Sequence, residues 1–309
     1  MTVVFAYHGR SATCWECIKV RGIVERIRGL RTAGQTEPPL REIGSVDEYV
    51  RWVFGTPPAD GEMAFYRGHS KAEEYKLTPW VLRSPAAAEA EPRMYRELLM
   101  ANPLDFREDR SAFERLARMQ HYGLPTRMLD TSTNPLIALF FACKSGKHHV
   151  GDVIRFTVAD DDVKYFDSDT VSCLANLAQM DGKDRRALDP SLDLEEFNKT
   201  IPAIKLLHFI KGEKPYFRNV IVPTDISRVL CVRGRHSNER VTAQSGAFLL
   251  FGQDAVLSEA GDETIAIRRV RVRKDRKDEI LKQLDTLAIN DGTAFRDIAT
   301  YAEYIRKQL

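Results

Sequence analysis

Three short stretches of this sequence contain side chains that could bind an anion or orient a substrate. The first is Phe65-Tyr66-Arg67-Gly68-His69-Ser70, where an arginine and a glycine stand at the end of an expected strand. A guanidinium on rigid backbone can give two parallel hydrogen bonds to a phosphate or carboxylate, and a glycine lets a ligand approach closely. We therefore expect Arg67 to bind an anion. The alternative left open by the residues alone is a structural ion pair.

The second stretch runs from Gln120 to Pro135 and leads from one expected helix into the next. It brings His121, Arg127 and the hydroxyls of Thr131-Ser132-Thr133 close to a helix N-terminus, whose free amides favour an anion. Histidine is the side chain that most readily changes charge near neutral pH, so His121 is a candidate for proton transfer. In the structural alternative, the hydroxyl run caps the helix and Arg127 pairs with Asp130.

The third stretch, Arg240 to Phe248, has Gln244 two residues before a glycine and an apolar strand. A glutamine amide both donates and accepts hydrogen bonds, so it could orient a substrate hydroxyl. A glutamine that only satisfies the backbone of a turn is the equal alternative.

The elements that must position these stretches are helices and strands without strict alternation. Ser45-Val46-Asp47-Glu48 is a capping-box pattern, and Asn134-Pro135 predicts the start of an apolar helix. The second half is richer in strands, of which Asp152 to Val158, Ala247 to Phe251 and Glu263 to Arg273 are the clearest. This mixture predicts an α+β fold rather than a doubly wound sheet.

Composition narrows the class of protein. The 309 residues carry 46 Lys plus Arg against 44 Asp plus Glu, and a net charge of +2 argues against a protein that coats nucleic acid. The longest apolar stretch is too short to span a membrane, and no signal peptide is evident, so a cytoplasmic protein without a membrane partner is expected. Three cysteines in apolar surroundings fit free thiols there: Cys143, Cys173 and Cys231.

The first 44 residues read as a separate N-terminal extension that ends in a turn-rich linker, ahead of one large domain over residues 45–309. The extension holds Cys14 and Cys17 in a C-x-x-C spacing, which could be redox-active or half of a zinc site. Without a second such pair, a structural or incidental role is favoured, and no metal site is predicted. We expect the extension to be a strand or short helix that docks on the main body, and the alternative is an arm that contacts a partner or nucleic acid.

The three stretches resemble the signatures of the FRG domain, a mostly bacterial family named for its Phe/Tyr-Arg-Gly stretch. The resemblance is carried by Phe65-Tyr66-Arg67-Gly68, by the run from Gln120 to Ala138, and by Gln244-Ser245-Gly246-Ala247-Phe248. It covers about Ser45 to Ile305. It implies one large FRG domain and an effector of toxin or phage-defence loci.

The order of the motifs also resembles ADP-ribosyltransferases of the Arg-Ser-Glu type. That resemblance implies a split β-sheet with surrounding helices and NAD as cofactor, gripped by an arginine, a hydroxyl run and an aromatic ring. On this enzyme hypothesis the catalytic residues are Arg67, His121, Thr133 and Gln244, and the cofactor-binding residues are Tyr66, Gly68, Tyr122, Arg127, Thr131 and Ser132; the resemblance itself implies Arg67, the hydroxyl run and Gln244. Gln244 departs from the family's glutamate, because an amide can neither act as a base nor stabilise positive charge as a carboxylate does.

The function predicted is an NAD-binding, ADP-ribosyltransferase-like effector acting on a host macromolecule, either protein or nucleic acid. Whether the chain is an enzyme stays open, as does its oligomeric state. The alternative is a non-catalytic nucleotide- or nucleic-acid-binding module, for which the basic run from Arg268 to Lys277 is the electrostatic argument. Such charges are more often a solvated face. A metal-dependent hydrolase is set aside, because Asp160-Asp161-Asp162 and His148-His149 lack ligand spacing.

Overall fold

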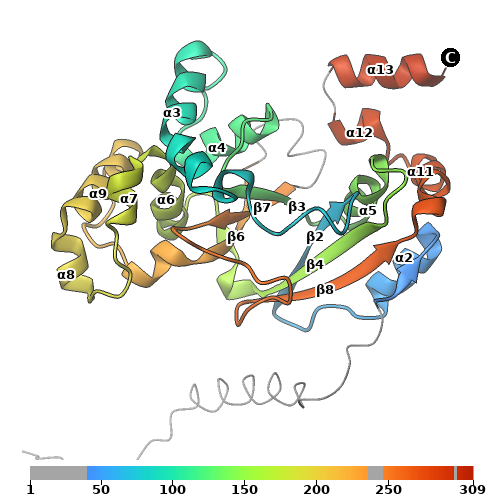
Figure 1. Cartoon of the computed structure of the whole chain (residues 1–309), viewed down its shortest axis with the longest axis horizontal. Helices are drawn as coiled ribbons and strands as arrows, with labels where there is room; N and C mark the ends of the chain where they lie inside the picture. Colours follow the sequence, from blue (N-terminus) through green and yellow to red (C-terminus); the bar gives the residue numbers. More distant parts are fainter. Residues whose placement is uncertain (1–39, 236–245, 296–297, 309) are drawn as a thin grey trace, which may run out of the picture. The chain divides into compact units, whose positions relative to one another are not determined.

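The computed structural model describes residues 40–235, 246–295 and 298–308 (Figure 1). In these residues eight strands form one mixed sheet. The strands are β1 Glu42–Ile43, β2 Glu62–His69, β3 Met128–Ser132, β4 Gly151–Ala159, β5 Lys164–Tyr165, β6 Val229–Arg233, β7 Gly246–Phe251 and β8 Ile265–Val272. The α+β fold class is confirmed. Strand β1 begins the sheet just before the predicted domain boundary at residue 45, and the division of the chain into 1–44 and 45–309 stays a prediction.

The helices lie around this sheet in two groups (Figure 1). They are α2 Val46–Phe54, α3 Pro85–Ala101, α4 Ala112–His121, α5 Pro135–Lys144, α6 Asp169–Asn176, α7 Gly182–Arg186, α8 Leu194–Lys199, α9 Ile201–Glu213, α11 Lys277–Thr286, α12 Asp291–Phe295 and α13 Ile298–Gln308. Short 3₁₀ turns are η1 Trp80–Leu82, η2 Asp160–Asp162, η3 Leu177–Gln179, η4 Pro223–Ser227 and η5 Lys274–Arg276. None of the described helices is long and apolar enough to cross a membrane.

Both predicted helix starts are confirmed by their caps. The Ser45 hydroxyl accepts a hydrogen bond from the Glu48 amide at 3.2 Å, and α2 follows it. The Asn134 side chain accepts from the Leu136 amide at 2.9 Å, with Pro135 at the first helical position of α5. Each cap satisfies an amide that the helix itself leaves without a partner, which fixes where the helix begins.

The strand order is β1-β8-β4-β2-β3-β7-β6-β5. Strand β2 pairs with β4 along all eight of its residues, and β3 pairs with β7 along all five, but β2 and β3 share only the pair Tyr66 and Ser132. The sheet therefore consists of two four-stranded halves that meet at a single register position.

Each half-sheet has its own helical cover. Helices α2, α5 and α11 pack on β2, β4 and β8 through residues such as Tyr49, Leu139 and Val270. Helices α4, α6 and α9 pack on β6 and β7 through residues such as Phe113 and Phe248. A third cluster runs along the opposite face and joins the two halves. The predicted free thiols Cys143, Cys173 and Cys231 are all buried in these clusters.

Helix α5 lies unusually close to strand β2, and Gly68 makes this possible. A Cβ atom at this position would stand 1.9 Å from the carbonyl oxygen of Ala138 and 2.7 Å from the amide nitrogen of Ala142. Both obstacles are helix backbone, which cannot move aside without moving the helix. Any side chain at residue 68 would therefore push α5 off the sheet.

We expect Gly68→Ala to lower the free energy of unfolding by about 3 kcal/mol, because it overpacks a backbone contact. The measurement is a urea titration followed by circular dichroism. The matched control is Gly212→Ala in α9, where an added Cβ meets no atom within 4 Å. Alanine is the better helix former, so this variant keeps its stability or gains up to about 1 kcal/mol. Equal stability of the two variants would contradict the packing role of Gly68.

Candidate functional site

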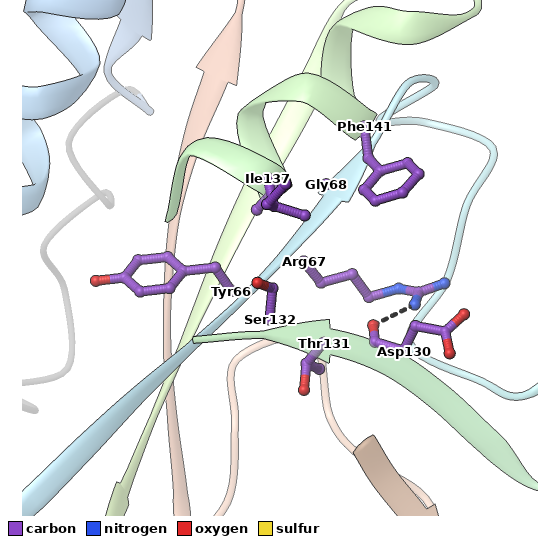
Figure 2. A pocket seen from close by; sticks show the side chains of 9 residues that line it. Tyr66, Arg67, Gly68, Asp130, Thr131, Ser132, Ile137 and Phe141 are labelled. Carbon is purple, nitrogen blue, oxygen red and sulfur yellow. Dashed lines mark hydrogen bonds between the residues drawn. The ribbon is translucent and has the colours of Figure 1, made fainter. Parts of the chain in front are cut away.

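A cavity of about 230 Å³ lies where the two half-sheets meet (Figure 2). Arg67 and Gly68 of β2 form one wall, and Asp130, Thr131 and Ser132 of β3 form another. Ile137 and Phe141 of α5 close it. Because β2 and β3 pair at one position only, the strands diverge beyond it and leave this opening. The first two stretches singled out in the sequence, Phe65 to Ser70 and Gln120 to Pro135, thus both contribute residues to this cavity.

Arg67 stands across the opening between the two strands. Its Nη1 donates to the backbone oxygen of Asp130 at 2.6 Å, and its Nε donates to Nε2 of His69 at 3.0 Å. The guanidinium is half-buried, and its burial lowers its pKa, with the nearby charge of Arg83 adding to the effect and that of Asp130 opposing it. An arginine stays charged in spite of such a shift. Arg67 therefore offers a fixed positive charge and its remaining N–H groups to the cavity.

His69 is a part of the site to which the sequence analysis gave no role. It is buried, and burial together with the charges of Arg67, Arg269 and Arg83 lowers its pKa to about 2. The ring is therefore neutral, with Nε2 as the acceptor that holds Arg67. Its Nδ1 is buried without a hydrogen-bond partner among the described residues. The signal was present in the sequence, because residues two apart on a strand share a face.

The polar residues of β3 divide between the two sides of the strand. Ser132 points to the same side as Arg67, and Thr131 points the other way (Figure 2). The Ser132 hydroxyl accepts from the Asn134 amide at 2.9 Å. The hydroxyl of Thr131 is buried without a hydrogen-bond partner among the described residues. Asp130 is half-buried and is the carboxylate on the described cavity wall.

Neither of the predicted aromatic rings faces Arg67 in the cavity, which corrects their role. Tyr66 borders the cavity, but its ring is buried in the core and its hydroxyl points away from Arg67 (Figure 2), close to Arg155. Tyr122 is exposed at the end of α4, where its ring contacts that of His121 at 4.9 Å between centroids. Neither Tyr122 nor His121 lines the cavity. The aromatic ring that faces Arg67 across the cavity is that of Phe141, which lies in the apolar helix predicted after Asn134-Pro135.

Arg127 has a structural role in place of the predicted cofactor-binding one. It is fully buried, and its guanidinium donates to both carboxylate oxygens of Glu91 and, at 3.3 Å, to the carbonyl oxygen of Phe251. Glu91 also accepts from Arg185 at 2.8 Å. The alternative that the sequence left open, an ion pair between Arg127 and Asp130, is also wrong, because Arg127 pairs with Glu91.

Gly68 borders the cavity, although the contact that requires a glycine is the one with α5. Thr133 is exposed and lines a second, larger groove next to the cavity. Gln244 lies outside the described residues, as do Cys14 and Cys17, and their roles stay predictions.

The comparison with protein families bears on this same region. The family model of the FRG domain matches residues 62–150. The chain carries an FRG domain. The FRG match spans β2, the cavity walls and α5, so it includes the arginine, the glycine and the hydroxyl run, and it ends before the Gln244 stretch. No curated protein and no solved structure matches the chain.

His69 gives the site a testable pH signature. The unfolded ring takes up a proton near pH 6.5, whereas the folded ring stays neutral down to about pH 2. The contribution of the neutral His69 ring to the free energy of unfolding is therefore fully present above about pH 6.5. It is lost as the pH is lowered, by about 1.4 kcal/mol between pH 7.5 and 5.5. We expect urea titrations to give this loss in the wild type in excess of the loss in His69→Gln, which still offers an acceptor to Arg67. Parallel losses in both proteins would rule out a buried neutral His69.

The structural role of Arg127 can be tested by the effect of its substitution on the free energy of unfolding. Arg127→Met leaves a buried carboxylate short of one partner, so we expect the free energy of unfolding to fall by about 3–5 kcal/mol. The control is Arg93→Met, which removes an exposed arginine 3.7 Å from Glu97 and should cost less than about 1 kcal/mol. A stable Arg127→Met protein that has lost ligand binding would overturn the structural role.

Proposed function

We propose that this FRG-domain chain binds NAD in the Arg67 cavity and transfers its ADP-ribosyl group to a host macromolecule. The toxin or phage-defence setting belongs to the same proposal and comes from the family resemblance. The observation that carries it is the adjacency of three strands in the order β2-β3-β7. Strand β2 holds Arg67, β3 ends in the hydroxyl run, and β7 begins two residues after Gln244. The three motifs are distant in sequence, and an NAD site needs them side by side.

The split between β2 and β3 supports the same proposal. A continuous ladder would fill the space between the strands with backbone hydrogen bonds, whereas here the strands diverge and an arginine stands in the gap. At about 230 Å³ the cavity lies a little below the range of about 300–1,000 Å³ typical of pockets for whole small molecules. It therefore suits one ring-sized end of NAD, with the remainder extending out of it.

The residues present fit the nicotinamide end of NAD. The Ser132 hydroxyl, on the Arg67 side of β3, can bond the carboxamide, and the ring of Phe141 gives an apolar wall. The fixed guanidinium of Arg67 can bond a phosphate or a ribose hydroxyl. When bound, NAD supplies an ADP-ribosyl group whose carbon–nitrogen bond to nicotinamide is broken.

Asp130 is the residue we propose to stabilise the positive charge that grows on the ribose as that bond breaks. Its carboxylate lies on the cavity wall next to the Arg67 contact. A carboxylate facing developing positive charge stabilises the transition state. Gln244 cannot supply this negative charge, and it is left with the positioning of a ribose hydroxyl through its amide.

The nucleic-acid-binding alternative loses its main argument, because the basic run is largely engaged within the protein. Arg269 pairs with Asp152 and Glu259, Arg271 with Glu73, and Arg273 with Asp275. Lys277 is buried and donates to three backbone carbonyls. Charges neutralised in this way contribute little to the attraction of a polyanion.

The test measures NAD binding by calorimetry and NAD consumption by release of nicotinamide. We expect Arg67→Lys to weaken binding at least tenfold, about 1.4 kcal/mol, because an ammonium cannot reproduce the fork of a guanidinium. Asp130→Asn should keep binding and lose turnover. Arg93→Lys, on the exposed face of α3, is the matched control and should change neither.

Three outcomes of this test distinguish an enzyme, a non-catalytic nucleotide-binding module and the absence of an NAD site. Binding with consumption and ADP-ribose on a protein or nucleic acid from lysate agrees with the proposal. Binding without consumption, even with such targets added, would leave the non-catalytic nucleotide module. No binding of millimolar NAD, or equal affinity of wild type and Arg67→Lys, would refute the site. Circular dichroism of each variant separates these results from loss of fold.

A further inference from the structure

A second concave surface lies at one end of the half-sheet β3-β7-β6-β5. In that half-sheet β5 and β6 are parallel, and β7 is antiparallel to both β6 and β3. The last residues of β3, β6 and β5 therefore lie at the same end as the first residue of β7. Here a groove of about 680 Å³ is lined by Thr133, Tyr165, Arg233, Arg235 and Gly246, among others. We call it the strand-end groove.

The strand-end groove combines a positive charge with an aromatic platform. The Arg233 guanidinium lies over the Tyr165 ring, 5.7 Å from its centroid. The backbone oxygen of Arg233 accepts from the Phe166 amide at 3.1 Å, and Tyr165 is the register partner of Arg233. These contacts fix the two side chains next to each other, while Tyr165 is still 58% exposed. An exposed ring held in place is ready for stacking.

The charges of the groove are not fully neutralised within the protein. Arg235 lies 3.7 Å from the buried carboxylate of Glu114, which also accepts from the Arg110 and Ser111 amides at the start of α4. For Arg233, no carboxylate among the described residues is within 4.0 Å of its guanidinium. One guanidinium with an open charge and one with a shared carboxylate favour an anionic ligand.

From these observations we infer that the strand-end groove binds a nucleotide, with its base stacked on Tyr165 and its phosphate on Arg233 and Arg235. Its volume lies within the range of small-molecule sites. Stacking on an aromatic ring and ion pairing with arginine are the two contacts that single-stranded nucleic acids and free nucleotides share. The inference concerns different residues from those of the Arg67 cavity and does not depend on ADP-ribosyl transfer.

The choice of probe distinguishes a single-stranded nucleic acid from a free nucleotide as the ligand of the groove. The first probe is a fluorescein-labelled single-stranded oligouridylate of eight nucleotides, read by anisotropy, and the second is AMP, read by calorimetry. We expect Tyr165→Leu and Arg233→Gln each to weaken binding of the recognised probe about tenfold, in line with the loss of one stacking or phosphate contact. Tyr165→Phe keeps the ring and should bind within about twofold of wild type.

The controls are Tyr216→Leu and Arg107→Gln, which change an exposed ring and an exposed arginine that do not line the groove. Oligonucleotide binding that is weakened by the groove variants and by salt supports the inference with nucleic acid as the source. AMP binding with the same sensitivity, without oligonucleotide binding, supports it with a free nucleotide or a nucleotide half of a larger cofactor. Binding of neither probe at millimolar AMP or micromolar oligonucleotide, or equal binding by Tyr165→Leu, Arg233→Gln and wild type, overturns it.

Because the Arg67→Lys variant alters only the cavity, it should leave this binding unchanged. A failure of the NAD experiment would therefore not carry over to the groove. The reverse also holds, since Arg233→Gln leaves the cavity wall intact.

Discussion

The contact between Arg67 and the backbone of Asp130 is the interaction on which the site depends. At this point the ladder between β2 and β3 has ended after a single pair, and a side chain supplies the connection that backbone groups supply elsewhere. A side-chain connection is longer than a backbone hydrogen bond, so it holds the strands apart while it links them. The cavity is the space that this arrangement leaves. The same guanidinium thus defines the opening and provides its charge.

The wall formed by α5 depends on a different kind of constraint. The helix can approach β2 only where the strand has no side chain, at Gly68, and this approach brings Ile137 and Phe141 to the edge of the cavity. Phe141 is in turn held by Phe295 of α12, with 5.8 Å between ring centroids. The apolar wall is therefore supported by residues near the end of the described chain. Packing and polar contacts together determine the shape of the site.

Local features of the fold could be predicted from the sequence, because their causes are local. The caps of α2 and α5 and the strand predicted over Asp152 to Val158 follow from patterns within one short window, and the α+β class follows from the mixture of such elements. The partners of charged side chains could not be predicted in this way. Arg127 and Arg67 stand in equally distinctive motifs, yet the first pairs with Glu91, 36 residues earlier, and the second faces a cavity. Only the tertiary structure decides which arginine meets a buried carboxylate. His69 was accessible through the two-residue period of a strand, whereas the role of Phe141 required the position of α5.

The single pairing of β2 with β3 has a consequence for how the chain is made. Residues 62–150 are the segment that the FRG family model recognises, but the strands within it find most of their partners outside it. Strand β3 needs β7, and β2 needs β4, which in turn pairs with β8. During synthesis β3 therefore lacks β7 until residue 251 has left the ribosome, and β4, the partner of β2, lacks β8 until residue 272 has done so. Such distant pairings slow folding and prolong the exposure of unpaired strand edges. The segment that defines the family by sequence is thus not a unit of folding, and a fragment cut at its limits would present two open edges to other chains.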